Sequence, residues 1–261
     1  MKSWKRMGGG VLFAALLTTS GQAGAVVDKA VYLLLDGTGS IDNTEFNQQV
    51  SAYVMAITNV LNPGTGIAIG AALFGGDDGM GGTQNEFFAL REIAVAGDKQ
   101  DLIDAFNGLD PNSRGVDTGS TAIGNAVTFA SDRLLTAFNE CLTIACIIDV
   151  STDGQNNSGS DPETAVSNAV TIDGIDAVNC IAVGNNADCD FVDGFGFQIA
   201  VSDFDAFQRG IEDKIGREVG VPEPGSVLLL AVGLVALGLA ASRRRGMKRA
   251  AGRNGQALLA A

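Results

Sequence analysis

Apolar runs of strand length alternate with amphipathic segments of helix length over most of the chain. The runs predict strands, and apolar residues that recur every three or four positions between them predict helices. The predicted strands cover 30–35, 67–74, 86–95, 144–150, 177–183 and 197–201, and the predicted helices cover 42–61, 98–109, 121–135, 162–170 and 203–218. Because strands alternate with helices, we expect an α/β fold with a doubly wound, mostly parallel sheet flanked by helices.

Acidic and hydroxyl-bearing residues directly follow two of these predicted strands. The first strand runs into Asp36-Gly37-Thr38-Gly39-Ser40, and the strand at 144–150 runs into Ser151-Thr152-Asp153-Gly154. Ligands of doubly wound sheets bind beyond the carboxyl ends of the strands, where Asp36 and Asp153 both lie. Carboxylate and hydroxyl oxygens are hard ligands, so this edge of the sheet suits Mg²⁺, Mn²⁺ or Ca²⁺.

Three further features bear on this site. Gly37 and Gly39 would let the turn close around an ion without Cβ clashes. Thr121 stands where the helix 121–135 begins, and its hydroxyl could either cap that helix or reach a ligand. Asp77-Asp78 could bind a cation, although a solvated loop is the favoured interpretation of this glycine-rich stretch.

Both ends of the chain carry sorting features. Residues 1–25 combine a basic head, an apolar run and Ala23-Gly24-Ala25, which is typical of a secretory signal peptide rather than an internal core segment. Near the other end, 227–241 is apolar throughout and slightly short of the roughly 17–25 residues of a membrane span. Arginines at 243–245 follow it and would stay on the cytoplasmic side, with 247–261 as a short cytoplasmic tail.

The C-terminal features together resemble a known bacterial sorting signal. Val221-Pro222-Glu223-Pro224-Gly225, the apolar run and the arginine cluster are similar, in order and spacing, to the Pro-Glu-Pro C-terminal (PEP-CTERM) signal of certain Gram-negative bacteria. The resemblance implies that segment 220–246 is read by an exosortase, which removes the tail. The protein would then be membrane-associated in transit and afterwards lie at the cell surface or outside the cell. An ordinary single-pass anchor is the alternative.

The segment between the two sorting features is strongly acidic. Residues 26–221 contain 29 acidic and 8 basic residues, a net charge of −21 against −13 for the whole chain. Such a surface argues against nucleic-acid binding. Acidity favours cations and solubility, although it does not by itself define a site.

All four cysteines, Cys141, Cys146, Cys180 and Cys189, lie in the part expected to be exported, where disulfides persist. Four cysteines allow three pairings. Cys180 with Cys189 would close a short loop after a strand, which leaves Cys141 with Cys146. Zinc binding is the alternative, but these spacings without any histidine disfavour it.

Three separate loops resemble the metal-ion-dependent adhesion site (MIDAS) of von Willebrand factor A (vWA) domains. They are Asp36-Gly37-Thr38-Gly39-Ser40, Gly119-Ser120-Thr121-Ala122-Ile123-Gly124 and Thr152-Asp153-Gly154, within a similarity that covers about 26–219. The resemblance implies that Asp36, Thr38, Ser40, Thr121 and Asp153 coordinate the metal, some of them through water. Thr38 stands where serine is expected, but the hydroxyl is kept. With only two carboxylates, the ion would keep a position for a carboxylate from a protein or matrix ligand.

Enzymatic interpretations are weaker. The chain has no histidine, which excludes Ser-His-Asp and Cys-His arrangements. Asp117-Thr118-Gly119-Ser120 matches an aspartic-protease loop, but no second such loop supplies the paired carboxylate. Leu35-Asp36-Gly37-Thr38 is similar to haloacid dehalogenase phosphatases, yet Leu34 stands where their nucleophilic aspartate is expected. We therefore expect a binding domain, not an enzyme. The alternative is a structural surface or matrix component in which a metal only stabilises the fold.

Overall fold

The computed structural model describes residues 26–76, 83–138 and 141–220. The predicted signal peptide, Asp77-Asp78, most of the sorting segment with its apolar run 227–241, and the tail 247–261 lie outside these described residues. Within the described part, no helix is both long and apolar enough to cross a membrane.

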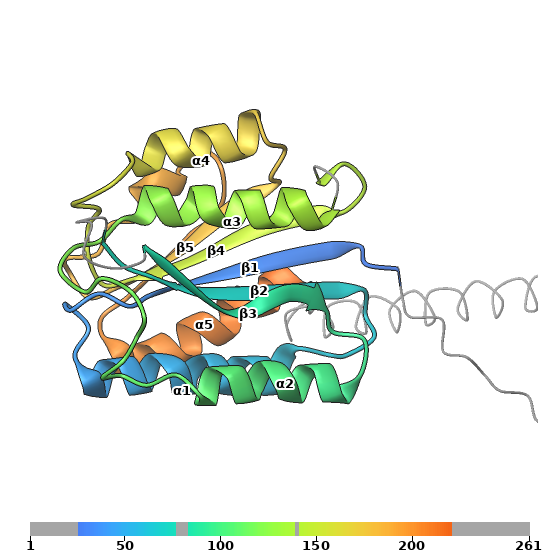
Figure 1. The fold of residues 1–261 in the computed structure, drawn as a ribbon, viewed down its shortest axis with the longest axis horizontal. Helices are drawn as coiled ribbons and strands as arrows, with labels where there is room; N and C mark the ends of the chain where they lie inside the picture. Colours follow the sequence, from blue (N-terminus) through green and yellow to red (C-terminus); the bar gives the residue numbers. More distant parts are fainter. Residues whose placement is uncertain (1–25, 77–82, 139–140, 221–261) are drawn as a thin grey trace, which may run out of the picture.

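One six-stranded sheet with the order β3-β2-β1-β4-β5-β6 forms the centre of the domain (Figure 1). The strands are β1 (Lys29–Asp36), β2 (Ile67–Phe74), β3 (Gln84–Glu92), β4 (Ala145–Thr152), β5 (Ala177–Val183) and β6 (Gln198–Val201). Only β3 runs antiparallel to its neighbour. The expected α/β fold with a mostly parallel sheet is therefore confirmed, and β1 and β4 lie side by side with their carboxyl ends at the same edge.

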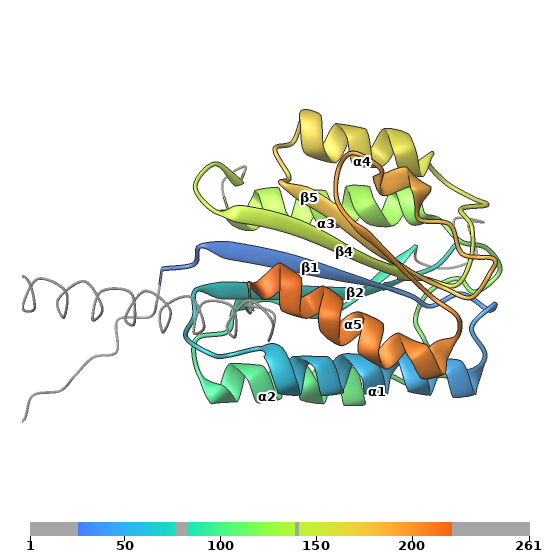
Figure 2. The ribbon, with the colours of Figure 1, turned by 180° about the vertical axis from the view of Figure 1, so that it is seen from behind.

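Helices cover both faces of the sheet (Figures 1 and 2). They are α1 (Asn43–Val60), α2 (Ala96–Asn107) and α5 (Phe204–Val219) on one face, and α3 (Ile123–Phe138) and α4 (Pro162–Thr171) on the other. Alternate residues of β1 enter two separate cores: Tyr32 and Leu34 pack on the α3 side, while Leu33 and Leu35 pack on the α1 side. This explains why the strand is apolar throughout, as expected for a strand buried on both faces.

Side-chain caps set the helix boundaries. Asp42 caps α1 by accepting hydrogen bonds from the N–H groups of Thr44 and Glu45, and the Glu45 carboxylate accepts one from the N–H of Asp42, as the sequence predicts. The helix predicted at 98–109 instead covers Ala96–Asn107. The Asp98 carboxylate accepts a hydrogen bond from the N–H of Val95, which stabilises a start two residues before Asp98. The preceding strand ends correspondingly earlier than 95.

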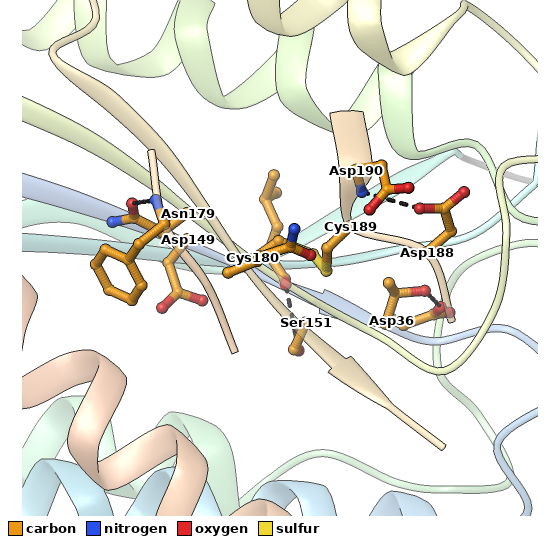
Figure 3. Close-up of a disulfide and its surroundings, with 12 residues drawn as sticks. Asp36, Asp149, Ser151, Asn179, Cys180, Asp188, Cys189 and Asp190 are labelled. Atoms are coloured by element: carbon orange, nitrogen blue, oxygen red, sulfur yellow. Dashed lines mark hydrogen bonds between the residues drawn. A yellow bond between two sulfur atoms is a disulfide. The ribbon is translucent and has the colours of Figure 1, made fainter. Parts of the chain in front are cut away.

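Two disulfides join the cysteines in the pairing favoured above. Cys141 bonds Cys146 and Cys180 bonds Cys189, with Cα atoms 5.9 and 5.8 Å apart, and none of the four is free. Figure 3 shows the Cys180–Cys189 bond. All four belong to the core on the α3 and α4 side of the sheet. The zinc alternative is therefore wrong.

A cluster of charged side chains is buried between α5 and the sheet. Lys214 of α5 forms ion pairs with Asp149 of β4 and, at 3.4 Å, with Glu218 one turn along the helix. Tyr53 donates to Asp149 at 3.2 Å, and Asn179 donates to Glu218 at 2.9 Å. Burial raises the pKa of Glu218 well above its usual value, and the neighbouring Asp149 carboxylate adds to the shift.

Candidate metal site

Asp36 is the last residue of β1, and its side chain is fully buried. The N–H of Thr38 donates to one carboxylate oxygen at 2.9 Å, and the hydroxyl of Thr152 donates to the other at 2.6 Å. Thr152 ends the neighbouring strand β4, so the parallel pairing of the two strands places its hydroxyl beside Asp36. The carboxylate is therefore held in one orientation by both strands.

A chain of hydrogen bonds joins the loop after β1 to the loop after β4. The hydroxyl of Ser40 donates to Oδ1 of Asp153 at 2.6 Å, and the hydroxyls of Thr38 and Ser40 are 3.0 Å apart. Since Ser40 gives its proton to Asp153, Thr38 donates to Ser40. The structure thus brings Thr38, Ser40 and Asp153 into direct contact, with Asp36 bound to the backbone of Thr38.

Thr121 reaches the same place from the third loop. Its N–H donates to the Asn157 side chain at 2.7 Å, and its carbonyl accepts from the N–H of Asn157 at 2.9 Å, which ties it to the loop after β4. A Cβ atom placed on Gly154 would lie 3.9 Å from the Thr121 hydroxyl and 4.0 Å from the Ser40 hydroxyl. Both hydroxyls therefore lie close to the same point beside Gly154. Helix α3 starts at Ile123, so Thr121 precedes the helix.

Gly37 and Gly39 also allow close packing within the protein. A Cβ on Gly37 would come within 2.9 Å of Val116, and one on Gly39 within 2.9 Å of the Thr118 carbonyl. The N–H of Gly39 donates to that same carbonyl. These glycines let the loop after β1 pack against residues 116–118, and the close approach is to protein atoms.

The donor set suits a hard divalent cation. It consists of two carboxylates and three hydroxyls, held by three loops at one edge of the sheet, and Mg²⁺ and Mn²⁺ prefer such oxygen ligands. Among the described residues, no group of three or more histidine, cysteine, aspartate or glutamate side chains is placed to hold a metal. Any cation bound at this edge would therefore depend on hydroxyl oxygens as well as on Asp36 and Asp153.

Burial makes both carboxylates unfavourable as anions in the metal-free protein. It raises the pKa of Asp36 to about 6, against the opposing effect of the hydrogen bonds from Thr152 and Thr38. Burial also raises the pKa of Asp153, and the hydrogen bond from Ser40 opposes it. A bound cation would relieve this penalty.

This shift predicts a pH effect on the metal-free domain. Folded Asp36 binds its proton more tightly than unfolded Asp36, so its contribution to stability is lost as the pH rises from about 4 to 6. Asp36→Asn removes the charge, so we expect the free energy of unfolding of the variant, relative to the wild type, to be higher at pH 7 than at pH 4.5 by up to about 2 kcal/mol. Urea unfolding in chelator measures this. A difference between the variant and the wild type that is the same at both pH values would contradict it.

Two residues that shape the site, Thr152 and Arg114, are not among those predicted from the sequence. Thr152 appears in the matching motif, but its bond to Asp36 depends on the pairing of β1 with β4. Arg114 lies under the loop after β1 and donates to several of its carbonyl groups. One signal could have found it: Arg114 is the only basic residue between Lys99 and Arg133 in a very acidic chain.

Three solved structures share this fold. Proximal thread matrix protein 1 from the mussel byssus, with a zinc-occupied MIDAS motif, has a TM-score of 0.58 and 16% identity over 75% of this chain and 48% of that chain. An aerotolerance-related membrane protein from Bacteroides fragilis NCTC 9343 has a TM-score of 0.53 and 18% identity over 73% and 98%. The pilus adhesin SpaC from Lactobacillus rhamnosus GG has a TM-score of 0.53 and 15% identity over 76% and 30%.

These similarities establish a vWA-like fold. The chain spans about half the length of the mussel protein, since the match covers 48% of that protein's chain. No curated protein matches the chain.

Two family models match the chain. Residues 220–245 match the PEP-CTERM protein-sorting motif, which implies an exported, surface-sorted protein that an exosortase processes. Residues 26–223 match the family described as "Protein of unknown function (DUF1194)". The chain therefore belongs to the DUF1194 family, with a vWA-like fold followed by a PEP-CTERM sorting motif.

Proposed function

We propose that the exported domain binds a protein or matrix ligand through a divalent cation held by Asp36, Thr38, Ser40, Thr121 and Asp153. The observation that carries this proposal is the convergence of three loops. The Thr38, Ser40 and Asp153 side chains form one hydrogen-bonded chain, and the Thr121 and Ser40 hydroxyls lie close to the same point beside Gly154.

The charge of this set favours an acidic ligand. Two carboxylates balance a divalent cation, and neutral hydroxyls supply the other protein oxygens. The cation would supply a positive centre for a carboxylate of the partner. Asp36, whose carboxylate is fixed by Thr38 and Thr152, would hold the cation from the end of β1. Asp153 would hold it from the loop after β4.

Two structural neighbours support this proposal. One holds zinc in a MIDAS motif, and another is a pilus adhesin. We propose binding rather than catalysis, because the chain has no histidine to serve as a general base beside these carboxylates.

A structural role is the second candidate. A neighbour in the mussel byssus is a thread matrix protein, and a surface component could use the cation only to stabilise its fold. Both roles predict that Mn²⁺ raises the melting temperature, since a ligand of the folded state stabilises it. Only the binding role predicts that the domain captures a surface partner, that chelator abolishes this capture, and that added Mn²⁺ restores it.

Thr121 offers the sharpest test of the site, because it alone represents the third loop. Thr121→Val keeps the shape and removes the oxygen, so we expect Mn²⁺ affinity to fall by on the order of 100-fold. Thr121→Ser keeps the hydroxyl and should bind within a few-fold of the wild type. Isothermal calorimetry of residues 26–220 measures both. Equal Mn²⁺ affinities of the two variants would show that the Thr121 hydroxyl is not a ligand of the metal.

A further inference from the structure

Arg114 is a buried cation in the loop between α2 and α3. Only 7% of the Arg114 surface is exposed, and the guanidinium lies 4.5 Å from the centre of the Phe46 ring. Burying an arginine is unfavourable unless its donors are satisfied. The pattern of its hydrogen bonds therefore indicates what it does.

The acceptors of Arg114 lie mainly in the loop that follows β1. One terminal nitrogen donates to the carbonyls of Gly37 at 3.2 Å and Thr38 at 2.6 Å. The other donates to the Ile41 carbonyl at 2.7 Å and to the Asn43 side chain at 3.4 Å, and Nε donates to the Pro111 carbonyl at 3.2 Å. A guanidinium has five N–H donors in a fixed plane, and here five acceptors surround it.

These bonds fix the backbone on which two of the candidate ligands stand. The Gly37 and Thr38 carbonyls point to Arg114, while the N–H of Gly39 points to the Thr118 carbonyl. With this backbone held from two sides, the hydroxyls of Thr38 and Ser40 stay together and reach Asp153. The loop is thus arranged before any ligand arrives, which lowers the entropy that binding must overcome.

The charge of Arg114 acts in the opposite direction. A positive group beside the site repels a divalent cation, and its interactions with Asp36 and Asp153 partly occupy their charge. Positioning and electrostatics therefore predict different outcomes when the guanidinium is replaced.

We propose that Arg114 is a positioning residue for the metal site: its planar guanidinium holds the loop after β1 in the metal-binding arrangement. This inference rests on the proposed function, because it concerns affinity for the same cation. Arg114→Lys keeps the positive charge but replaces the planar fork with a point charge of at most three donors. The variant should therefore lose positioning and keep the repulsion.

The test is a calorimetric titration with Mn²⁺ of the wild type, Arg114→Lys and a control, Arg91→Lys. Arg91 also lies over an aromatic ring, Phe88, and pairs with Asp101, but it lies on β3. We expect Arg114→Lys to weaken Mn²⁺ binding by about 10–100-fold and Arg91→Lys to change it less than twofold. Circular dichroism and melting in chelator identify a temperature at which every variant is folded.

The outcomes distinguish a failure of this inference about Arg114 from a failure of the proposed metal-binding function. Unchanged Mn²⁺ affinity in Arg114→Lys, with or without a lower melting temperature, would show a purely structural role and overturn the inference. Arg114→Met extends the test, since tighter binding in that variant would show that repulsion outweighs positioning and would overturn the inference. If neither variant folds, Arg114 serves the fold and the inference fails. No heat with the wild type would overturn the proposed function as well.

Discussion

We expect Mn²⁺ to produce no measurable binding heat with the Asp36→Ala, Asp153→Ala double variant under conditions where the wild type gives a clear binding signal. The two carboxylates are the only anionic groups in the candidate ligand set, and they belong to two different loops joined through Ser40. Their loss removes both the charge that attracts a divalent cation and two of its oxygen ligands. Isothermal calorimetry of residues 26–220 measures the effect, which we expect to exceed about 100-fold in affinity.

A second double variant controls for net charge. Asp188→Ala with Asp190→Ala also removes two acidic residues, both exposed in the loop after β5 near the Cys180–Cys189 disulfide (Figure 3). We expect it to bind Mn²⁺ like the wild type, apart from a small change that added salt screens. Wild-type heat in the Asp36 and Asp153 variant, or equal losses in both variants, would show that the domain binds Mn²⁺ only as a diffuse acidic surface.

Lys214→Met is expected to lower the free energy of unfolding by about 3–5 kcal/mol at pH 7. Lys214 is completely buried and is the positive partner of both Asp149 and Glu218. Methionine fills a similar volume but leaves the two carboxylates without a counter-charge in the core. For a domain of this size, the loss corresponds to a fall in melting temperature of about 10 °C.

The matched control is Arg209→Met, an exposed position on the same helix. It removes the same charge, and we expect a change of about 0.5 kcal/mol or less. Because burial raises the pKa of Glu218, its protonation would relieve part of the unpaired charge, and the effect of Lys214→Met should shrink at pH 5. Equal and small effects of both substitutions in urea unfolding would contradict the account of this cluster.

The sequence predicts the fold well because each strand is a short apolar run and each helix has a distinct apolar face. The order of the elements implies that β1 and β4 end at one edge, so Asp36 and Asp153 could be placed together before the structure was known. Local capping was also predictable, since the Asp42 and Glu45 pair lies three residues apart.

The sequence could not predict contacts between residues that are distant along the chain. Asp149 interrupts an apolar strand and Lys214 stands between Ile211 and Ile215, so both are visible as charges at buried positions. Their pairing depends on how α5 lies across the sheet. In the same way, Arg114 looks like a solvated loop residue until the loop after β1 is seen around its guanidinium.

We propose that three loops of the chain hold one divalent cation. Anomalous diffraction from crystals of residues 26–220 grown with Mn²⁺ tests it most directly. The account predicts one strong manganese peak within about 2.5 Å of oxygens from Asp36 or Asp153 and from the hydroxyls of Ser40 or Thr121, directly or through one water. A peak elsewhere in the domain, or no peak with the Thr121 hydroxyl turned away from Ser40, would contradict it.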